Sequence, residues 1–151
     1  MSAELAWAIK SSFLRYVESA GGVISLAPPA TWTNDRFVFP LADRGDAQVG
    51  MRLAFDGEVA IRAYGGLLDV QIADLTLLLD GEHGIVSAAT LDRSRRYDLA
   101  HLTRRSPSET VGPIEFTAEL HESAVGLFGG VYAEGTALDA ILVTGDVLQT
   151  Q

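Results

Sequence analysis

The amino-acid sequence predicts an α+β domain that is mostly antiparallel β, arranged as a sandwich or a curled sheet, with an N-terminal helix and a short C-terminal helical turn. Three observations indicate this class. Apolar residues recur at helical spacing near the start of the chain, apolar and polar residues alternate over most of the remainder, and glycine-rich or proline-rich breaks separate the alternating segments. A chain of 151 residues suits a single domain, which we expect to cover residues 1–151.

The first segment is expected to be a helix. One face carries apolar residues at intervals of three or four positions, namely Leu5, Ile9, Phe13, Tyr16 and Val17. Ser2 is expected to cap the start of this helix, and Gly21 followed by Gly22 is expected to end it. Tyr16 is therefore predicted on the buried face near the helix end, opposite a polar face that begins at Lys10.

From Gly22 onward the pattern changes to a period of two, which is typical of strands. Pro28 and Pro29 separate the first of these segments from the next. Asp56-Gly57 is a two-residue hairpin signal, so the segments on either side of it are expected to pair with each other. The strands expected in this part of the chain are 22–27, 36–40, 50–55, 58–64, 67–72 and 75–80.

The second half of the chain continues the alternation after a turn at residues 80–84. Residues 92–112 are polar and arginine-rich, and they are expected to form a long loop that holds at most a short strand at 97–102. The segment ESAVGLFGG, residues 122–130, is expected to be a short helical turn closed by its glycines. The remaining expected strands are 85–90, 114–120 and 140–148.

Composition excludes several classes of site and disfavours several partners. The chain has no cysteine, which excludes disulfides, thiolate metal sites, cysteine nucleophiles and cysteine-anchored haem. Its formal net charge of -9 disfavours nucleic acids and anionic membranes as partners. No apolar run approaches the roughly 20 residues of a membrane span, and the first residues lack the pattern of a secretory leader. We therefore expect a cytoplasmic protein, or an exported one whose leader has been removed.

Known catalytic and cofactor motifs are absent from the sequence. It contains no phosphate-binding GxxxxGK(S/T), no dinucleotide-binding GxGxxG, no HExxH and no GxSxG. The histidines His83, His101 and His121 lack the helical spacing of a zinc site. Residues 92–105 are rich in arginine, which would suit either contact with an anion or a solvated loop that balances nearby acids. These patterns assign no catalytic residue.

The segment EVAIRAYGGLLDVQI places a large phenol, Tyr64, directly before two glycines. If Val59 and Ile61 face the core, strand alternation puts Arg62 and Tyr64 together on the other face. One interpretation is that Tyr64 fills a core and the glycines make a turn. The other is that the glycines clear space for a flat ligand that the phenol contacts.

The order of several short motifs along the chain resembles the HtaA-type haem-binding domain family. The opening segment LAWAIKSSFLRYV carries the residues of that family's first helix at Trp7, Lys10, Ser12, Phe13 and Tyr16. The resemblance continues through FVFPL, the segment from RLAF to LLL, and GIVSAAT, and it returns in the closing segment from LHESAVGLFGG to ALDAILVT. Nearly the whole chain is covered, and the arginine-rich segment is the least similar part.

Members of this family capture haem in Actinobacteria, mostly at the cell surface, and pass it on for iron uptake. The resemblance implies a non-covalent b-type haem whose iron is bound by the tyrosine of the first helix, which is Tyr16 here. In the family, a histidine in a Gly-His-x-Gly element supports that tyrosinate by a hydrogen bond. This chain has Ala63-Tyr64-Gly65-Gly66 at those positions, so Tyr64 either donates the hydrogen bond or binds the iron itself.

The resemblance also implies a haem pocket around the two tyrosines. Phe13, Leu67 and Phe128 are expected to contact the apolar faces of the haem, and Gly65 is expected to leave room for its edge. The residues expected to hold the propionates are Lys10, either Ser11 or Ser12, and an arginine such as Arg62.

Function classes remain open at the level of the sequence. The first is a haem-binding module for transport, storage or sensing. The second is an enzyme on the same scaffold, either haem-dependent or with a pocket for a small molecule, and the third is an interaction domain without haem. The expected ligand is haem or another flat apolar molecule, and a homodimer is one assembly that the sequence leaves open.

Overall fold

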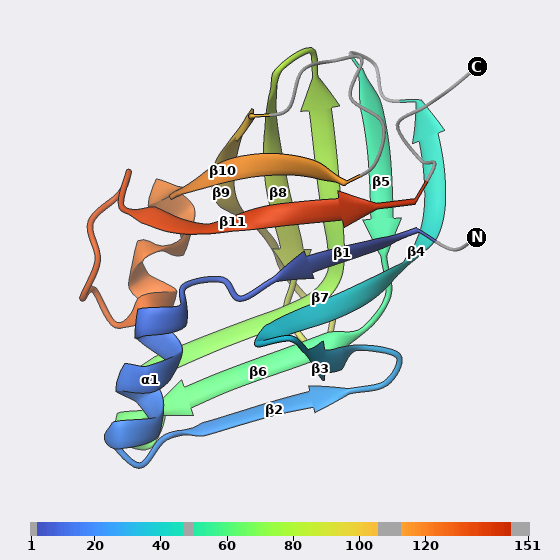
Figure 1. Ribbon diagram of the computed structural model, residues 1–151. Helices are drawn as coiled ribbons and strands as arrows, with labels where there is room; N and C mark the ends of the chain where they lie inside the picture. The colour runs from blue at the N-terminus through green and yellow to red at the C-terminus, as the bar shows by residue number, and fades with distance from the viewer. Residues whose placement is uncertain (1–2, 47–49, 106–112, 146–151) are drawn as a thin grey trace.

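The computed structural model describes residues 3–46, 50–105 and 113–145 (Figure 1). The helices in these residues are the α-helix α1 (Ser11–Ser19) and the 3₁₀ helices η1 (Tyr64–Gly66) and η2 (Glu122–Phe128). The strands in these residues are β1 (Glu4–Trp7), β2 (Val23–Ala27), β3 (Thr31–Thr33), β4 (Arg36–Asp46), β5 (Met51–Phe55), β6 (Glu58–Ala63), β7 (Leu68–Asp80), β8 (His83–Ala89), β9 (Arg96–Arg104), β10 (Ile114–Leu120) and β11 (Ala137–Thr144).

The strands form one antiparallel sheet that closes on itself. Their order is β2-β6-β7-β5-β4-β1-β11-β10-β9-β8, and β8 also pairs with β7. The run from β7 through β4, β1 and β11 to β8 is therefore a closed barrel, while β2 and β6 extend the sheet beyond it and β3 pairs with β4 (Figure 1). The predicted class, mostly antiparallel β with an N-terminal helix, is confirmed, and the expected curled sheet curls until its ends meet.

Strand β7 allows this closure because it pairs with three other strands. Its first part pairs with β6, its second part pairs with β5, and β8 pairs along much of its length. The register with β8 shifts between Ala73 and Thr76, where Asp74 has a φ of 48°. Such a bulge bends a strand and increases its twist. The two short strands expected at 67–72 and 75–80 are thus one continuous bent strand.

The barrel encloses the apolar residues that alternate along the strands. In β6, Val59 and Ile61 have no exposed surface, as the alternation predicts. The largest side chains in this core that are almost fully buried are Trp7, Phe13, Phe37, Phe39, Phe55, Phe116 and Phe128. Two of these rings come from the helices: α1 packs against β2 and β6, η2 packs against β7 and β9, and Phe13 of α1 contacts Phe128 of η2 (Figure 1). The helices that carry candidate site residues are therefore fixed by core packing.

The predicted start of the first helix is wrong. Residues Glu4–Trp7 form β1, which lies between β4 and β11, and α1 begins only at Ser11. Leu5 and Ile9 fit a helical spacing, but Leu5 and Trp7 also alternate as an inward-facing strand pair, and both are fully buried. Ile9 then takes a φ of 66°, which separates the strand from the helix. Ser2, the expected cap, lies outside the described residues, whereas the predicted end near Gly21 is confirmed.

The predicted hairpin at Asp56-Gly57 is also wrong. Strands β5 and β6 do not pair with each other, because both lie along the same neighbour, β7. Gly57 has a φ of 120°, and a Cβ at this position would lie 2.6 Å from the Cβ of Ala30. Asp56 and Gly57 therefore connect two collinear strands, β5 and β6, and do not reverse the direction of the chain. At this connection the chain passes close to Ala30.

Two other expectations change in extent. The short strand expected at 97–102 is the longer strand β9 over residues 96–104, and residues 106–112 of the expected loop lie outside the described residues. The last strand begins at Ala137 and ends at Thr144, and the end of the expected strand at 140–148 lies outside the described residues. The predicted helical turn near the C-terminus is confirmed as η2, which ends in the left-handed Gly129.

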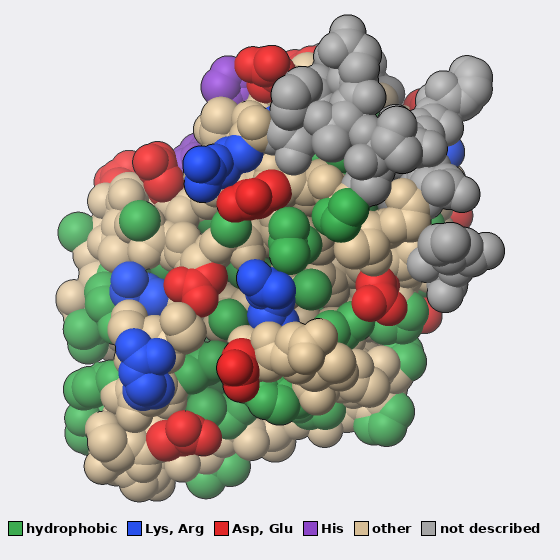
Figure 2. Space-filling view, in the orientation of Figure 1, with side chains coloured by type: hydrophobic (Ala, Val, Ile, Leu, Met, Phe, Trp, Pro, Cys, Tyr) green, Lys and Arg blue, Asp and Glu red, His purple; other side chains and the backbone are tan. Residues whose placement is uncertain are grey.

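The described surface carries charges of both signs without an evident metal cluster. Figure 2 shows Lys and Arg side chains interspersed with Asp and Glu side chains over this face. Within the described ranges, no group of three or more His, Asp or Glu side chains could hold a metal ion. Among the helices described, none has both the length and the apolar character that crossing a membrane requires.

Candidate functional site

Tyr16 and Tyr64 meet at the surface of the domain, although they are 48 residues apart in the sequence. Tyr16 lies on α1, and Tyr64 begins the turn between β6 and β7. Their hydroxyl oxygens are 2.7 Å apart, a hydrogen-bond distance, and their ring centroids are 6.1 Å apart with a tilt of 47°. Tyr16 is 37% exposed and Tyr64 is 51% exposed. The expectation that Tyr16 lies on a buried face is therefore wrong.

The backbone of the β6–β7 turn places Tyr64. Tyr64, Gly65 and Gly66 have φ values of 55°, 65° and 98°, so three consecutive residues lie at positive φ. Positive φ costs a non-glycine residue about 1–2 kcal/mol, and the two glycines avoid that cost. A Cβ at Gly65 would meet nothing within 4 Å, so this glycine provides backbone freedom and does not relieve crowding. The question raised by the Tyr-Gly-Gly sequence is thus answered by a tight turn with an exposed phenol.

The structure brings Arg62 to the same turn. Arg62 points outward from β6, and its Nε lies 3.9 Å from a carboxylate oxygen of Asp69. Arg62 and Tyr64 line one side of a shallow hollow of about 520 Å³, together with Gly22 and Gly66. Arg62 and Tyr64 were predicted to share one face of a strand, but β6 ends at Ala63, so Tyr64 is not part of the strand. The two side chains are neighbours all the same.

The hydrogen bond with Tyr16 is the largest of the effects that raise the pKa of the Tyr64 hydroxyl above its ordinary value. An ordinary phenol already has a pKa of about 10. Tyr64 therefore keeps its proton at neutral pH and can donate a hydrogen bond to a neighbouring oxygen.

An aromatic cluster lies near the tyrosine pair. Phe13 and Phe128 contact each other with ring centroids 4.8 Å apart, and neither has any exposed surface. The structure thus places both phenylalanines in the core and not on a surface that a haem face would contact directly. Tyr132 packs edge-on against Phe13, with the centroids 5.9 Å apart. Burial, followed by the proximity of Tyr16, raises the pKa of Tyr132, so a third tyrosine borders the site.

Lys10 and Ser12 lie at the beginning of α1. The Nζ of Lys10 donates to the carbonyl oxygen of Ala137 at 3.2 Å and lies 5.4 Å from the ring centroid of Tyr132. Ser12 is exposed and lies one helical turn before Tyr16, so the two residues share a helix face. Tyr132 was missed by reasoning from the sequence, although it belongs to the closing segment that resembles the family.

Exposed apolar side chains lie on two neighbouring turns, one of which carries Tyr64. Leu67 follows Gly66 and is 80% exposed, and Val131 follows η2 and is 54% exposed. A Cβ at Gly129 would lie 3.9 Å from the carbonyl oxygen of Leu67, which shows that the two turns are neighbours. Exposed apolar side chains that are grouped together usually mark a binding surface.

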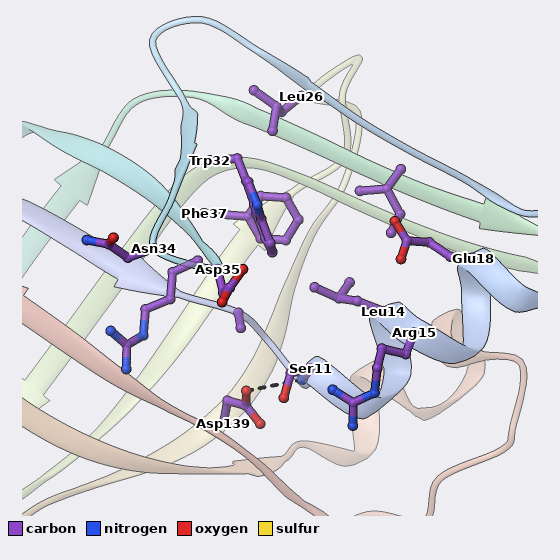
Figure 3. Close-up of a pocket in the computed structure, with 13 residues that line it drawn as sticks. Ser11, Leu14, Arg15, Glu18, Leu26, Trp32, Asn34, Asp35, Phe37 and Asp139 are labelled. Carbon is purple, nitrogen blue, oxygen red and sulfur yellow. Dashed lines mark hydrogen bonds between the residues drawn. The ribbon is translucent and has the colours of Figure 1, made fainter.

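A larger cavity of about 810 Å³ lies on the opposite flank of α1 (Figure 3). Arg15 and Glu18 project toward it from α1, while Trp32 and Asp35 project toward it from the β3–β4 hairpin. Its lining contains no Tyr, His, Met or Cys, which are the side chains that bind haem iron. Of the predicted site residues, only Ser11, the alternative to Ser12, lines this cavity.

Asp139 on β11 fixes the start of α1. Its carboxylate accepts a hydrogen bond from the backbone N–H of Ser11 at 3.1 Å (Figure 3). Its own N–H donates to the carbonyl of Ile9 at 2.8 Å, and its carbonyl accepts from Trp7 Nε1 at 2.7 Å. One residue therefore joins the end of β1 and the first turn of α1 to the barrel. Reasoning from the sequence missed this role, because nothing local to Asp139 indicates a partner more than a hundred positions away.

Comparisons with known proteins identify the family and the fold. The HtaA family model matches residues 2–144. No curated protein sequence matches the chain. The C-terminal domain of HtaA from Corynebacterium glutamicum is similar to this chain with a TM-score of 0.78 and 25% identity, over 95% of this chain and 94% of that one.

Two further crystal structures from the same organism share the fold. The N-terminal domain of HtaA has a TM-score of 0.73 and 23% identity, over 95% of this chain and 96% of that one. The haem-binding protein HtaB has a TM-score of 0.69 and 18% identity, over 95% of this chain and 93% of that one. Because the family model matches almost the full length of the chain and the fold agrees, this chain belongs to the HtaA family.

Proposed function

We propose that this domain binds ferric haem without a covalent bond, for haem uptake and transfer, with the Tyr16 phenolate as the axial ligand. The observation that carries the proposal is the hydrogen bond between the hydroxyls of Tyr16 and Tyr64 at an exposed apolar surface. Tyrosinate is an established haem ligand. Membership of the HtaA family and the similarity to a haem-binding protein, HtaB, support the same function.

Tyr64 supplies what a phenolate ligand needs from its surroundings. For Tyr16 to bind iron it must lose its proton, and the resulting negative charge is stabilised by a nearby donor. Tyr64 stays protonated, because its pKa is raised, and its O–H can donate to the Tyr16 oxygen at the observed distance. A hydrogen bond to a charged acceptor is roughly twice as strong as a neutral one. A phenol in this role also adds no positive charge at mildly acidic pH, as an imidazole would.

The rest of the surface fits a flat ligand with an apolar body and an anionic edge. Leu67 and Val131 offer exposed apolar contact beside the tyrosines. Arg62 lines the hollow beside Tyr64, Lys10 lies over the ring of Tyr132, and Ser12 adds a hydroxyl on the Tyr16 face of α1. We propose that these three polar side chains hold the propionates. The larger cavity beyond α1 lacks any iron ligand, so we assign the haem to the tyrosine side of the helix.

Titration with hemin tests this function. We expect the Soret band of hemin to shift on mixing with the protein, and the shift to be lost in Tyr16→Phe, which removes the ligand oxygen but keeps the ring. Tyr64→Phe should retain binding with lower affinity, because losing a hydrogen bond to a charged group costs about 1.5–3 kcal/mol, which is about a ten- to hundredfold change in Kd.

Arg15→Gln is the matched control for these variants. Arg15 lies on the same helix one residue before Tyr16, but it faces the other cavity, so its loss should leave hemin binding unchanged. An unshifted hemin spectrum with the native protein, or a Tyr16→Phe variant that binds like the native protein, would contradict the proposal.

A further inference from the structure

We propose that Tyr16 and Tyr64 form an oxidative cross-linking site, at which a one-electron oxidant joins the two rings into an intramolecular dityrosine. The two hydroxyl oxygens are 2.7 Å apart and the ring centroids are 6.1 Å apart. Within the described residues, each hydroxyl has the other as its hydrogen-bond partner. This proposal goes beyond haem binding and does not depend on it.

Exposure distinguishes this pair from the other tyrosines. An oxidant in solution reaches both rings, since Tyr16 is more than one third exposed and Tyr64 is about half exposed. Tyr97 is largely buried, and its hydroxyl donates to the carbonyl of Gln71. Tyr132 is half-buried and packs edge-on against the core rings of Phe13 and Phe128. Among the described tyrosines, Tyr16 and Tyr64 are therefore the pair whose rings meet in a place open to solvent.

The reaction balances with a peroxide as the terminal oxidant. Each phenol loses one electron to the oxidant and its hydroxyl proton to water, which gives two phenoxyl radicals. A carbon–carbon bond then forms between the ring carbons next to the two hydroxyl-bearing carbons. Each of those carbons releases its hydrogen as a proton while the phenol oxygen regains one. Overall, two phenols and one hydrogen peroxide give one dityrosine and two waters.

The local backbone favours coupling within one chain. The positive φ values at Gly65 and Gly66 lie in a region open to glycine, so the turn that carries Tyr64 can adjust at little cost. A Cβ at Gly65 would meet nothing within 4 Å, which leaves the turn space in which to move. Tyr16, in contrast, is held on a helix that packs on the core through Phe13. A movable ring thus lies beside a fixed one.

The product would be a covalent cross-link between α1 and the β6–β7 turn. It would join positions 48 residues apart, so the loop that it closes restricts the unfolded chain. Both phenol oxygens survive the coupling, and the Tyr16 oxygen would remain available as a ligand. The cross-link would therefore fix the spacing of the two phenols without removing either of them.

Photochemical oxidation of the purified full-length chain tests the proposal. A ruthenium tris-bipyridyl complex with persulfate, under visible light, supplies the one-electron oxidant without haem. After tryptic digestion, we expect peptide 16–36 joined to peptide 63–93, at a mass two hydrogen atoms below their sum, together with the blue fluorescence of dityrosine. The yield per chain should not change on dilution, and the unfolding midpoint of the cross-linked protein should rise. A parallel reaction with hemin and hydrogen peroxide should give the same joined peptides.

Variants separate this pair from the alternatives. Tyr64→Phe and Tyr16→Phe should each lose the joined peptides, and Tyr132→Phe should keep them, with circular dichroism confirming that each variant folds. The proposal is overturned if the fluorescence persists in Tyr64→Phe, if Tyr16 instead joins the peptide that holds Tyr132, or if cross-links form only between copies and disappear on dilution. Failure to bind hemin would leave these outcomes unchanged, so the two proposals can fail separately.

Discussion

At the scale of single residues, Tyr64 combines an unfavourable backbone with a polar contact. Its φ of 55° is uncommon for an aromatic residue, and such conformations occur preferentially at functional sites. Two hydrogen bonds offset the cost of this conformation: the one to Tyr16, and one from the N–H of Leu67 to the carbonyl of Tyr64 at 3.2 Å. The two glycines that follow allow the turn to continue at positive φ. The turn is therefore built so that one phenol points at another.

Gly66→Ala should destabilise the domain and weaken the tyrosine pair. Its φ of 98° is unfavourable for any residue with a Cβ, and the added Cβ would lie 3.2 Å from Nη2 of Arg62. We expect a loss of about 1–2 kcal/mol, which corresponds to a fall in Tm of about 2–4 °C per kcal/mol for a chain of this size. Thermal unfolding followed by circular dichroism measures the change.

Gly126→Ala is the control for this substitution. Gly126 has no positive φ, and a Cβ there would meet nothing within 4 Å. Its Tm should stay close to that of the native protein. If both variants have the same Tm, the positive φ of Gly66 in the β6–β7 turn does not require glycine.

The sequence predicts part of this residue-scale picture. The Tyr-Gly-Gly segment identifies Tyr64 as unusual, and the resemblance to the family pairs it with Tyr16, which the 2.7 Å contact confirms. The exposure of Tyr16 was not predicted. The apolar pattern along α1 indicates which face packs on the protein, but not how far the neighbouring elements extend along that face. Tyr132 escaped notice for a related reason, since its place beside Phe13 depends on the packing of η2 against α1.

At the scale of elements, α1 depends on the rest of the molecule for its position. It has nine residues, and no side chain of its own segment caps its start. A helix this short is marginal in isolation. Its placement therefore comes from Phe13 and Val17 in the core and from the three hydrogen bonds of Asp139.

Asp139→Ala should lower haem affinity even though Asp139 lies on the flank of α1 opposite to the tyrosines. Removing a carboxylate that accepts from the first N–H of a helix costs about 0.5–2 kcal/mol, and the loosened helix no longer holds Tyr16 against Tyr64. We expect a lower Tm and a higher Kd for hemin, measured by circular dichroism and absorbance titration.

Asp139→Asn and Glu18→Gln sharpen this test. The amide oxygen of Asn can still accept from Ser11, so this variant should retain most of the affinity. Glu18 lines the same cavity and is exposed, so its substitution should change neither quantity. Equal effects of Asp139→Ala and Glu18→Gln would show that the contact to Ser11 does not position the helix.

Errors in the predicted elements share a physical cause. Leu5 and Trp7 satisfy a strand alternation, while Leu5 and Ile9 satisfy a helical spacing, and only the neighbours β4 and β11 decide for the strand. Asp56-Gly57 has the composition of a hairpin turn, but the chain has a better partner for both flanking strands in β7. In both places, pairing with a distant strand prevailed over the local pattern.

At the scale of the whole molecule, the fold class could be predicted and the closure of the barrel could not. Alternation shows which residues of a strand face inward, and this was correct for Val59 and Ile61. Strand order depends on which distant segments pair. The sequence of β7 indicates only a strand, and it does not indicate that β7 pairs with β8 across a bulge at Asp74. The predicted single domain over residues 1–151 stays a prediction.

Alkaline pH should destabilise the folded domain. Burial raises the pKa of Tyr97 far above the ordinary value of about 10, because removing the hydroxyl from water disfavours the charged phenolate. The same hydroxyl donates to the carbonyl of Gln71. A pKa that is higher in the folded state gives stability that is complete below the unfolded pKa and is lost as the pH rises above about 10. We expect the free energy of unfolding, measured in urea at a series of pH values, to fall in this range.

Tyr97→Phe should reduce the loss of unfolding free energy at alkaline pH. At neutral pH the variant should lose about 1 kcal/mol, because the carbonyl of Gln71 loses its donor, but its stability should depend less on pH above about 10. Tyr64→Phe should change the slope less, because its ring is exposed. A Tyr97→Phe protein with the same alkaline slope as the native protein would show that Tyr97 ionises without unfolding.

The position of β1 has a consequence for the order in which the protein can be completed on the ribosome. Residues 4–6 pair with residues 142–144, so β1 has its β11 neighbour only after β11 has emerged. The same late strand carries Asp139, which holds the helix of Tyr16. A chain that stops before β11 lacks one wall of the barrel and the contact that anchors the first turn of α1, so we expect it not to hold Tyr16 against Tyr64.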